Sequence, residues 1–359
     1  MMRRTPERLF ALLEADLRRR AFAPRAPGAP RRIGAEVELI PVSADGGEPV
    51  PIEQRAPAGN VSARERGTLP LLRRVGAGRG WLEERSQKGI PSFRLPCGGS
   101  ITFEPGGQIE YGSPPCNSAS QLLHRLREVI EPLREEALKE GITLLAAGID
   151  PVNELERVPL RLGGERYVAM DRYLGSIGPA GQRMMRQTAS IQVNLDLGDE
   201  AMLRWRVLNR AAPFVTAAFA NSPWYGGRAT GYQSWRAECW RRLDERRTGI
   251  FPGDGDAVSE YLRFAMRAPA MMMPRDGRYL PFECFVRSGA ASFSAWRTHL
   301  STLFPEVRPR GYLEVRSCDS IPPEWHAAPI ALLAGITYDA EALRTAAEIL
   351  PEGDEDLLH

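Results

Sequence analysis

The sequence is short of lysine, histidine and regularly spaced cysteine. Lys88 and Lys139 are the only lysines among its 47 basic residues, so arginine supplies nearly all of the positive charge. Such a bias is typical of a GC-rich genome. Arginine also binds carboxylates and phosphates through two parallel hydrogen bonds, which lysine cannot do. The composition is compatible with both explanations.

The scarce residue types exclude several kinds of site. The five cysteines are scattered without a CxxC spacing, and the four histidines form no HExxH pattern. This argues against a zinc site and against a disulfide framework, and it fits a reducing cytoplasm. The formal net charge of +2 is too close to balance to indicate a nucleic-acid partner.

Long apolar runs are also lacking. No stretch reaches the length of a membrane span, and the N-terminal region alternates charge with leucine instead of forming a signal-peptide core. The sequence therefore predicts a soluble, cytoplasmic protein without a membrane partner. A monomer and a homodimer are both compatible with it.

The helical pattern accounts for much of the chain. An apolar stripe with arginines on the other side predicts a helix over Thr5–Arg20. The region Asp45–Gly89 is rich in glycine, proline and charge, and we expect mostly loop there with a short helix or two. Further helices are expected over Ser118–Glu140, Asp199–Asn221 with Asp199 as N-cap, Ser294–Phe304, Glu324–Thr337 and Asp339–Leu350.

Four segments read as strands with one apolar and one polar face. In Ile33–Leu39, Glu36 and Glu38 share a face opposite the apolar residues, because strand side chains alternate. The same alternation marks Ser100–Tyr111, Thr188–Leu197 and Gly311–Ser317. A polar face can simply meet water. The earliest two segments, however, carry almost only carboxylates and amides, with glycine and proline kinks that allow a ligand to approach.

The wording of these segments resembles the plant-type glutamate–cysteine ligases, a branch of the glutamine-synthetase-like carboxylate–amine ligases. Glu104–Glu110 reads EPGGQIE, a form of the family's EPGGQxE signature, and Gly34–Glu38 matches its opening GxExE strand. Further matches follow in family order over about residues 31–340. They are Arg166, Tyr167, Met170 and Tyr173; Met184, Met185, Thr188 and Gln192–Asp196; Ala220–Pro223; Ser234 and Arg236; Trp240, Asp244 and Arg247–Gly249; and Tyr312–Arg316 with Asp319.

The resemblance implies a fold and a reaction. It implies one α+β catalytic domain spanning residues 1–359, with a curved, mainly antiparallel sheet, helices on its convex face and the site on its concave face. The activity implied is formation of γ-glutamylcysteine from glutamate and cysteine. ATP would be the co-substrate, two or more Mg²⁺ ions the cofactors, and γ-glutamyl phosphate the intermediate.

The resemblance also implies roles for single residues. Mg²⁺ prefers oxygen ligands, and the metal ligands implied are Glu36, Glu38, Glu104, Glu110 and Glu314. Catalytic roles are implied for Glu36, Glu104 and Arg247. Substrate binding is implied for Gln108, Arg166, Thr188, Gln192, Asn194, Arg236, Arg247 and Tyr261, and nucleotide binding for Arg186 and Arg316.

The chain departs from the family pattern in one region. Arg267 and Ala295 stand where aspartates are usual, and the segment between Pro274 and Ala295 is short. We expected that segment to contribute to the amine pocket. Two alternatives therefore stay open: a γ-glutamyl ligase for a different amine, and a catalytically silent protein that binds glutamate or nucleotide as a regulator. Retention of the five glutamates argues against the silent protein.

Overall fold

A nine-stranded antiparallel sheet organises the computed structural model, which describes residues 5–23, 28, 30–53, 67–85 and 91–351. The strand order is β10-β11-β7-β1-β5-β4-β3-β2, and β6 pairs with the second half of β1. The strands are β1 (Ile33–Ser43), β2 (Leu82–Arg85), β3 (Pro91–Arg94), β4 (Ser100–Phe103), β5 (Ile109–Gly112), β6 (Ile142–Leu145), β7 (Ser190–Leu195), β10 (Val307–Pro309) and β11 (Leu313–Asp319).

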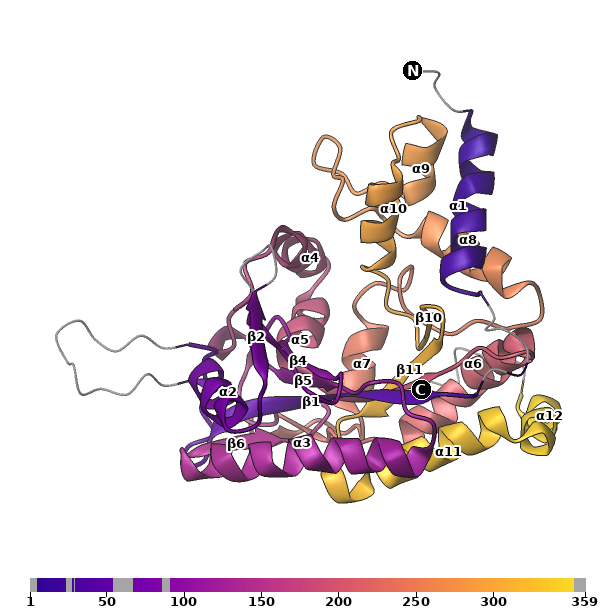
Figure 1. Cartoon of the computed structure of the whole chain (residues 1–359). Helices are drawn as coiled ribbons and strands as arrows, with labels where there is room; N and C mark the ends of the chain where they lie inside the picture. The colour runs from indigo at the N-terminus through magenta and orange to yellow at the C-terminus, as the bar shows by residue number, and fades with distance from the viewer. Residues whose placement is uncertain (1–4, 24–27, 29, 54–66, 86–90, 352–359) are drawn as a thin grey trace.

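The apolar face of the sheet is covered by helices. The even spacing of apolar residues in β1 buries Val37 and Leu39, and the same spacing in β7 buries Ile191 and Val193. Against this face pack α3 (Ala119–Lys139), α6 (Ala201–Ala218) and α11 (Ala327–Tyr338), and α12 (Ala340–Ile349) packs on α6 and α11. Figure 1 shows α3 and α11 running beneath the sheet. This helical layer leaves the polar face free to carry a site.

A second group of helices stands over the polar face. Figure 1 shows α4, α5, α9 and α10 above the level of β1, with α1 descending beside α8. These elements are α1 (Pro6–Arg20), α4 (Glu165–Gly175), α5 (Pro179–Gln187), α7 (Trp235–Arg241), α8 (Ala257–Arg267), α9 (Phe282–Arg287) and α10 (Phe293–Leu300). The remaining described elements are α2 (Thr68–Ala77), the 3₁₀ turns η1 (Leu155–Arg157) and η2 (Pro323–Trp325), and a small hairpin of β8 (Trp224–Tyr225) and β9 (Arg228–Ala229).

The expected class is confirmed, a helical protein with a mainly antiparallel sheet. The four predicted strand segments and six predicted helices are all present, with ends that shift by a few residues. Asp199 is not the N-cap of α6; that position is Glu200, whose side chain makes no capping bond. Within Asp45–Gly89, α2 is the expected short helix, and the short strand β2 replaces part of the expected loop. Residues 54–66 and 86–89 lie outside the described residues. The helices over the polar face largely escaped prediction.

Candidate active site

The polar face of the sheet forms the floor of a cavity of about 740 Å³. Its floor is made by β1, β5 and β7, and its walls come from α1, α4, α5, α7, α8, α10 and β10. The cavity therefore draws on segments from residue 16 to residue 316. Because the sheet is antiparallel, polar residues of neighbouring strands align across it.

Three carboxylates converge on the cavity floor. One oxygen each of Glu38, Glu104 and Glu110 lie within 4.8 Å of one another. Glu38 in β1 is directly opposite Glu110 in β5, and Glu110 is opposite Thr102 in β4, so the register places these side chains in one row. We call Glu38, Glu104 and Glu110 the acidic triad.

Glu104 reaches the triad from the turn that joins β4 to β5. The Gly107 amide donates to the Glu104 carbonyl at 2.8 Å, and Gly107 has a φ of 97°, which favours glycine. A side chain at Gly106 would place its Cβ 1.8 Å from the Arg186 carbonyl oxygen. The two glycines are therefore required by a turn that packs tightly against the end of α5.

Gln108 fixes this turn rather than pointing a free amide at the cavity. Its Oε1 accepts from the Gly106 amide at 3.0 Å, and its Nε2 donates to the Thr188 carbonyl at 2.8 Å. The side chain lines the cavity but is only 2% exposed. These two hydrogen bonds join the turn that carries Glu104 to the segment that leads into β7.

Hydrogen bonds from β7 hold the first triad member. Glu38 Oε2 accepts from the Ser190 amide at 2.7 Å and from its hydroxyl at 3.0 Å, and Glu38 Oε1 accepts from Gln192 Nε2 at 3.1 Å. Glu110 Oε1 accepts from Thr102 Oγ1 at 2.8 Å. These donors orient the carboxylates without neutralising their charge.

Burial raises the pKa of every triad member. Burial, with the charge of Glu38 next, raises the pKa of Glu110 to about 7. Burial also raises the pKa of Glu38, and it raises that of Glu104 well above the usual range, followed by repulsion from Glu110 and Glu38. Like charges crowded in a desolvated site favour the protonated form. A bound cation would reverse this, and three hard carboxylate oxygens suit Mg²⁺.

Glu36 lies beside the triad rather than within it. It lines the cavity, and its Oε1 accepts from Asn194 Nδ2 at 3.4 Å. Burial, followed by repulsion from Glu314 and Glu110, raises the pKa of Glu36 to about 7. Its role as a metal ligand or catalytic group stays a prediction.

Glu314 is placed differently from the other four glutamates. Its side chain has no exposed surface and does not line the cavity. Its Oε2 accepts from Arg308 Nε at 2.6 Å and from Arg316 Nη1 at 2.8 Å, and its Oε1 accepts from Arg310 Nη1 at 2.9 Å. Despite burial, Arg308 and Arg316 hold the pKa of Glu314 well below its usual range. Glu314 is thus the anion of an arginine cluster, and its role as a metal ligand stays a prediction.

Most of the expected substrate-binding residues do line the cavity. Arg236 Nη2 donates to the Arg316 carbonyl at 2.8 Å, and Arg316 Nη1 donates to Gln192 Oε1 at 2.7 Å. Both guanidinium groups lie 5.0 Å from the Trp240 ring. The expected residues brought to the cavity are Gln108, Arg166, Thr188, Gln192, Arg236, Tyr261 and Arg316.

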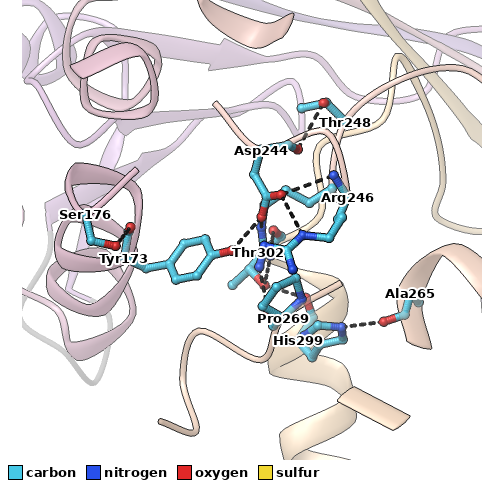
Figure 2. Close-up of polar contacts among 10 residues, drawn as sticks. Tyr173, Ser176, Asp244, Arg246, Thr248, Ala265, Pro269, His299 and Thr302 are labelled. Atoms are coloured by element: carbon cyan, nitrogen blue, oxygen red, sulfur yellow. Dashed lines mark hydrogen bonds and ion pairs between the residues drawn. The ribbon is translucent and has the colours of Figure 1, made fainter. Parts of the chain in front are cut away.

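Arg247 is the main departure among them. It is fully buried and does not line the cavity. Figure 2 shows Tyr173, Asp244, Pro269 and Thr302 gathered around one point. There Arg247 Nε donates to Asp244 Oδ2 at 3.0 Å, and its Nη1 and Nη2 donate to the carbonyls of Thr302 and Pro269. In this structure Arg247 clamps three loops together, and its expected contact with substrate stays a prediction.

Two other expected contacts are also absent from the cavity wall. Arg186 donates through Nε to Asp171 Oδ1 at 2.9 Å, which joins α5 to α4. Asn194 is opposite both Gly34 and Glu314 in the register and donates to Glu36. Neither side chain lines the cavity. In this structure both support residues around the site instead of forming its surface.

Some residues of the site were not expected. Ser190 binds Glu38, and it shares the polar face of β7 with Gln192, so strand alternation was the available signal. Trp240, which was named only as a family match, lines the cavity, and the guanidinium groups of Arg236 and Arg316 lie over its ring. Arg308 in β10 and Arg310 in the turn that follows also line the cavity, and they lie two residues apart in the sequence.

The fold and site define an α+β protein whose antiparallel sheet forms the floor of a cavity lined by carboxylates and arginines. The particular family follows from comparison. The model of "Glutamate-cysteine ligase family 2 (GCS2)" matches residues 32–358. The chain belongs to this family.

Curated relatives agree with this assignment. The chain is 37% identical over 272 residues to glutamate–cysteine ligase EgtA of Mycolicibacterium smegmatis, covering 71% of this chain and 63% of EgtA. It is 33% identical to the chloroplastic glutamate–cysteine ligase of Medicago truncatula, covering 68% of this chain and 51% of the relative. The chain thus spans between half and two thirds of these relatives.

The fold likeness extends to a solved structure. The glutamate–cysteine ligase of Francisella tularensis in complex with AMP aligns with a TM-score of 0.50 at 13% identity, covering 92% of this chain and 69% of that one. This agreement concerns the fold alone. No helix among the described residues has both the length and the hydropathy needed to cross a membrane.

Proposed function

We propose that the chain is an ATP- and Mg²⁺-dependent glutamate–cysteine ligase of thiol biosynthesis, of the glutathione or ergothioneine type. The γ-carboxylate of glutamate attacks the γ-phosphorus of ATP, which releases ADP and gives γ-glutamyl phosphate. The cysteine amine then attacks the acyl carbon. Phosphate leaves, the ammonium proton is lost to solvent, and γ-glutamylcysteine is formed.

The observation that carries this proposal is the acidic triad within a cavity that arginines also line. The reaction brings a triphosphate and two amino acids together, so negative charge must be offset. Bound Mg²⁺ supplies that offset by screening phosphate and carboxylate oxygens. Glu38, Glu104 and Glu110 are the residues that would hold it.

The arginines supply the second part of the chemistry. Arg166, Arg236 and Arg316 present guanidinium groups to the same cavity. The Nε of Arg316 is buried without a hydrogen-bond partner among the described residues. Buried cations of this kind pair with carboxylate or phosphate oxygens. The support is thus a site with ligands for a cation and for the anions that the cation bridges.

The identity of the amine is the main alternative. The motive for a different amine was the change at Arg267, Ala295 and the short segment between Pro274 and Ala295. None of residues 274–295 lines the cavity, and neither does Arg267. The structure therefore gives these departures no contact with the site, and cysteine remains the amine of the proposal.

The test is turnover with glutamate, cysteine, ATP and MgCl₂, followed as phosphate release and as γ-glutamylcysteine by mass spectrometry. We expect product from the wild-type chain and at least a 100-fold loss in Glu104→Gln, because one triad oxygen donor is removed. Glu131→Gln is the matched control, since Glu131 is exposed on α3 beneath the sheet.

Three other results would redirect the proposal. Equal product from wild type and Glu104→Gln would remove the triad from the mechanism. Faster phosphate release with another amine in a panel would favour a different γ-glutamyl ligase. Nucleotide binding in a calorimeter that is independent of Mg²⁺, without any turnover, would favour the regulatory protein.

A further inference from the structure

The last turn of α1 forms part of the cavity wall, although α1 precedes the segment that the family model matches. Asp16, Leu17, Arg20 and Ala21 line the cavity, and the family match begins at residue 32. Figure 1 shows α1 standing beside α8 and α10. The site therefore includes side chains that the family assignment does not cover.

Several contacts fix α1 in this position. Leu13 and Leu17 are buried in the main core. Arg18 Nη2 lies 2.8 Å from Asp256 Oδ2 at the start of α8, and the Gly311 amide donates to the Ala21 carbonyl at 2.9 Å. The last of these ties the helix end to the hairpin that carries Arg308 and Arg310. The turn is thus held by the core, by α8 and by the sheet.

Asp16 is a buried carboxylate whose two cationic neighbours are exposed arginines. It is 3% exposed, and its Oδ1 lies 3.4 Å from Arg19 Nη2 and 3.8 Å from Arg297 Nη2. The side chains of those arginines are 76% and 52% exposed. Arg19 Nη2 donates a long hydrogen bond to Asp16 Oδ1 from an exposed side chain, and Arg297 lies beyond hydrogen-bond distance, so neither is the close, buried cation that best stabilises a buried carboxylate. Because Asp16 lines the cavity, a cationic group of a ligand can bind next to its carboxylate.

The residues around Asp16 have the opposite charge. Arg20, Arg297 and Arg310 line the same cavity, and the side chain of Arg20 makes no hydrogen bond or ion pair with any described residue. Leu17 and Tyr261 supply apolar surface between them. A carboxylate beside several arginines can bind a ligand that carries both charges, because the carboxylate binds its positive group and the arginines bind its negative group.

We propose that this wall is a subsite for the head group of an α-amino acid. Asp16 accepts hydrogen bonds from the ammonium group, and arginines of the α1, α10 and β10 wall bind the carboxylate. The inference rests on the proposed function, which supplies two such ligands, glutamate and the amine substrate. Asp16 is then a specificity-determining residue that selects amino acids over ligands without an amino group.

The test is calorimetry on the full chain with Mg²⁺ present. L-Glutamate and L-cysteine are titrated beside glutarate and 3-mercaptopropionate, which lack the amino group. We expect Asp16→Asn to weaken one of the two amino acids by about 10- to 100-fold, the range of a charged hydrogen bond, and to leave its deamino analogue unchanged. The amino acid affected identifies the source of the head group.

Two further variants separate recognition from folding. Glu14→Gln removes the same charge from the same helix, where Glu14 contacts Arg18 and does not line the cavity, and we expect wild-type binding. Asp16→Glu keeps the charge, and we expect it to retain the preference for amino acids over the deamino analogues.

The inference is overturned if Asp16→Asn binds both amino acids as the wild type does. Equal weakening of an amino acid and its analogue, or no binding of either amino acid to the wild type, also overturns it. The proposed function fails separately: Asp16-dependent binding without any γ-glutamyl product rejects the ligase and keeps the subsite.

Discussion

Glu110 and Glu314 project from the polar face of the same sheet, in strands separated by β1 and β7, yet their surroundings are opposite. Glu110 accepts one bond, from Thr102, and faces Glu38 and Glu104. Glu314 is surrounded by Arg308, Arg310 and Arg316. Hence burial raises the pKa of Glu110 to about 7, while the arginines depress that of Glu314.

The comparison separates two uses of a buried carboxylate. A group whose charge is already matched stabilises the fold and has nothing left for a ligand. A group crowded by like charge destabilises the metal-free fold and keeps its capacity to bind a cation. Although Glu110 and Glu314 occupy equivalent positions in the strand pattern, we therefore expect neutralising mutations at the two sites to change stability in opposite directions.

The largest expected effect is at the matched group. Glu314→Gln should lower the free energy of unfolding by about 3–5 kcal/mol, because it leaves Arg308 and Arg316 buried with uncompensated like charge. Urea denaturation of the metal-free protein measures it. Glu84→Gln, which breaks an exposed pair with Arg94, is the control and should change stability by less than about 1 kcal/mol. If Glu314→Gln changes the free energy of unfolding as little as Glu84→Gln does, the difference between matched and crowded carboxylates is wrong.

A second matched pair should behave in the same way. Arg247→Met should cost about 3 kcal/mol, since Asp244 would lose its buried partner and the loops at Thr302 and Pro269 would lose their donor. Arg241→Met, at a half-exposed pair with Glu238, provides the comparison. Glutamate affinity should be largely retained in any Arg247→Met protein that stays folded. Weak glutamate binding with unchanged stability would instead restore the direct substrate contact.

The crowded carboxylates should make the stability of the metal-free protein depend on pH. Glu36 and Glu110 have folded pKa values near 7, above their unfolded values, so their contribution is complete below about pH 4.5 and is lost as pH rises through 7. From pH 6.5 to 8, the metal-free protein should lose stability on the order of 2 kcal/mol. Mg²⁺ should reduce the loss, because it stabilises the ionised carboxylates.

Thermal melts with EDTA or MgCl₂ at the two pH values measure this effect. The window avoids the buried His299 and His326, whose lowered pKa values, about 3 and about 4, make them costly only as pH falls below about 6.5. A metal-free stability that is flat or rises over the window would contradict the crowding of the triad.

The smallest effect has the opposite sign from the first. Glu110→Gln should raise metal-free stability by about 1 kcal/mol at pH 8, because it removes one like charge and its amide oxygen can still accept from Thr102. The same variant should lose the stabilisation by MgCl₂. Stabilisation by Mg²⁺ equal to that of the wild type would place the metal elsewhere.

The strand pattern predicted which face of the sheet each side chain lies on more reliably than it predicted which side chains contact one another. Alternation placed Glu36 and Glu38 on the polar side of β1, and the EPGGQ wording brought Glu104 and Glu110 to the same site. Alternation could not distinguish Glu110 from Glu314. The partners of Glu314 include Arg308 and Arg310, whose position depends on how the β10–β11 hairpin pairs at the edge of the sheet.

The helical part shows the same limit. The apolar stripe of α1 predicted the helix, and the burial of Leu13 and Leu17, one helical turn apart, followed from the pattern. Nothing in that pattern indicated that Asp16 would meet Arg297, more than 280 residues away in the chain. Arg247 was likewise recognised as part of a motif, while its enclosure depends on three loops that converge around it.

The sequence by itself determined the α+β class, the polar and apolar faces of the strands, and four of the glutamates that line the cavity, because side-chain alternation and glycine-dependent turns are local properties of the chain. Only the tertiary structure decided which charges are matched. Electrostatic energy depends on the distance between groups and on their burial, and both are set by the packing of segments far apart in the sequence.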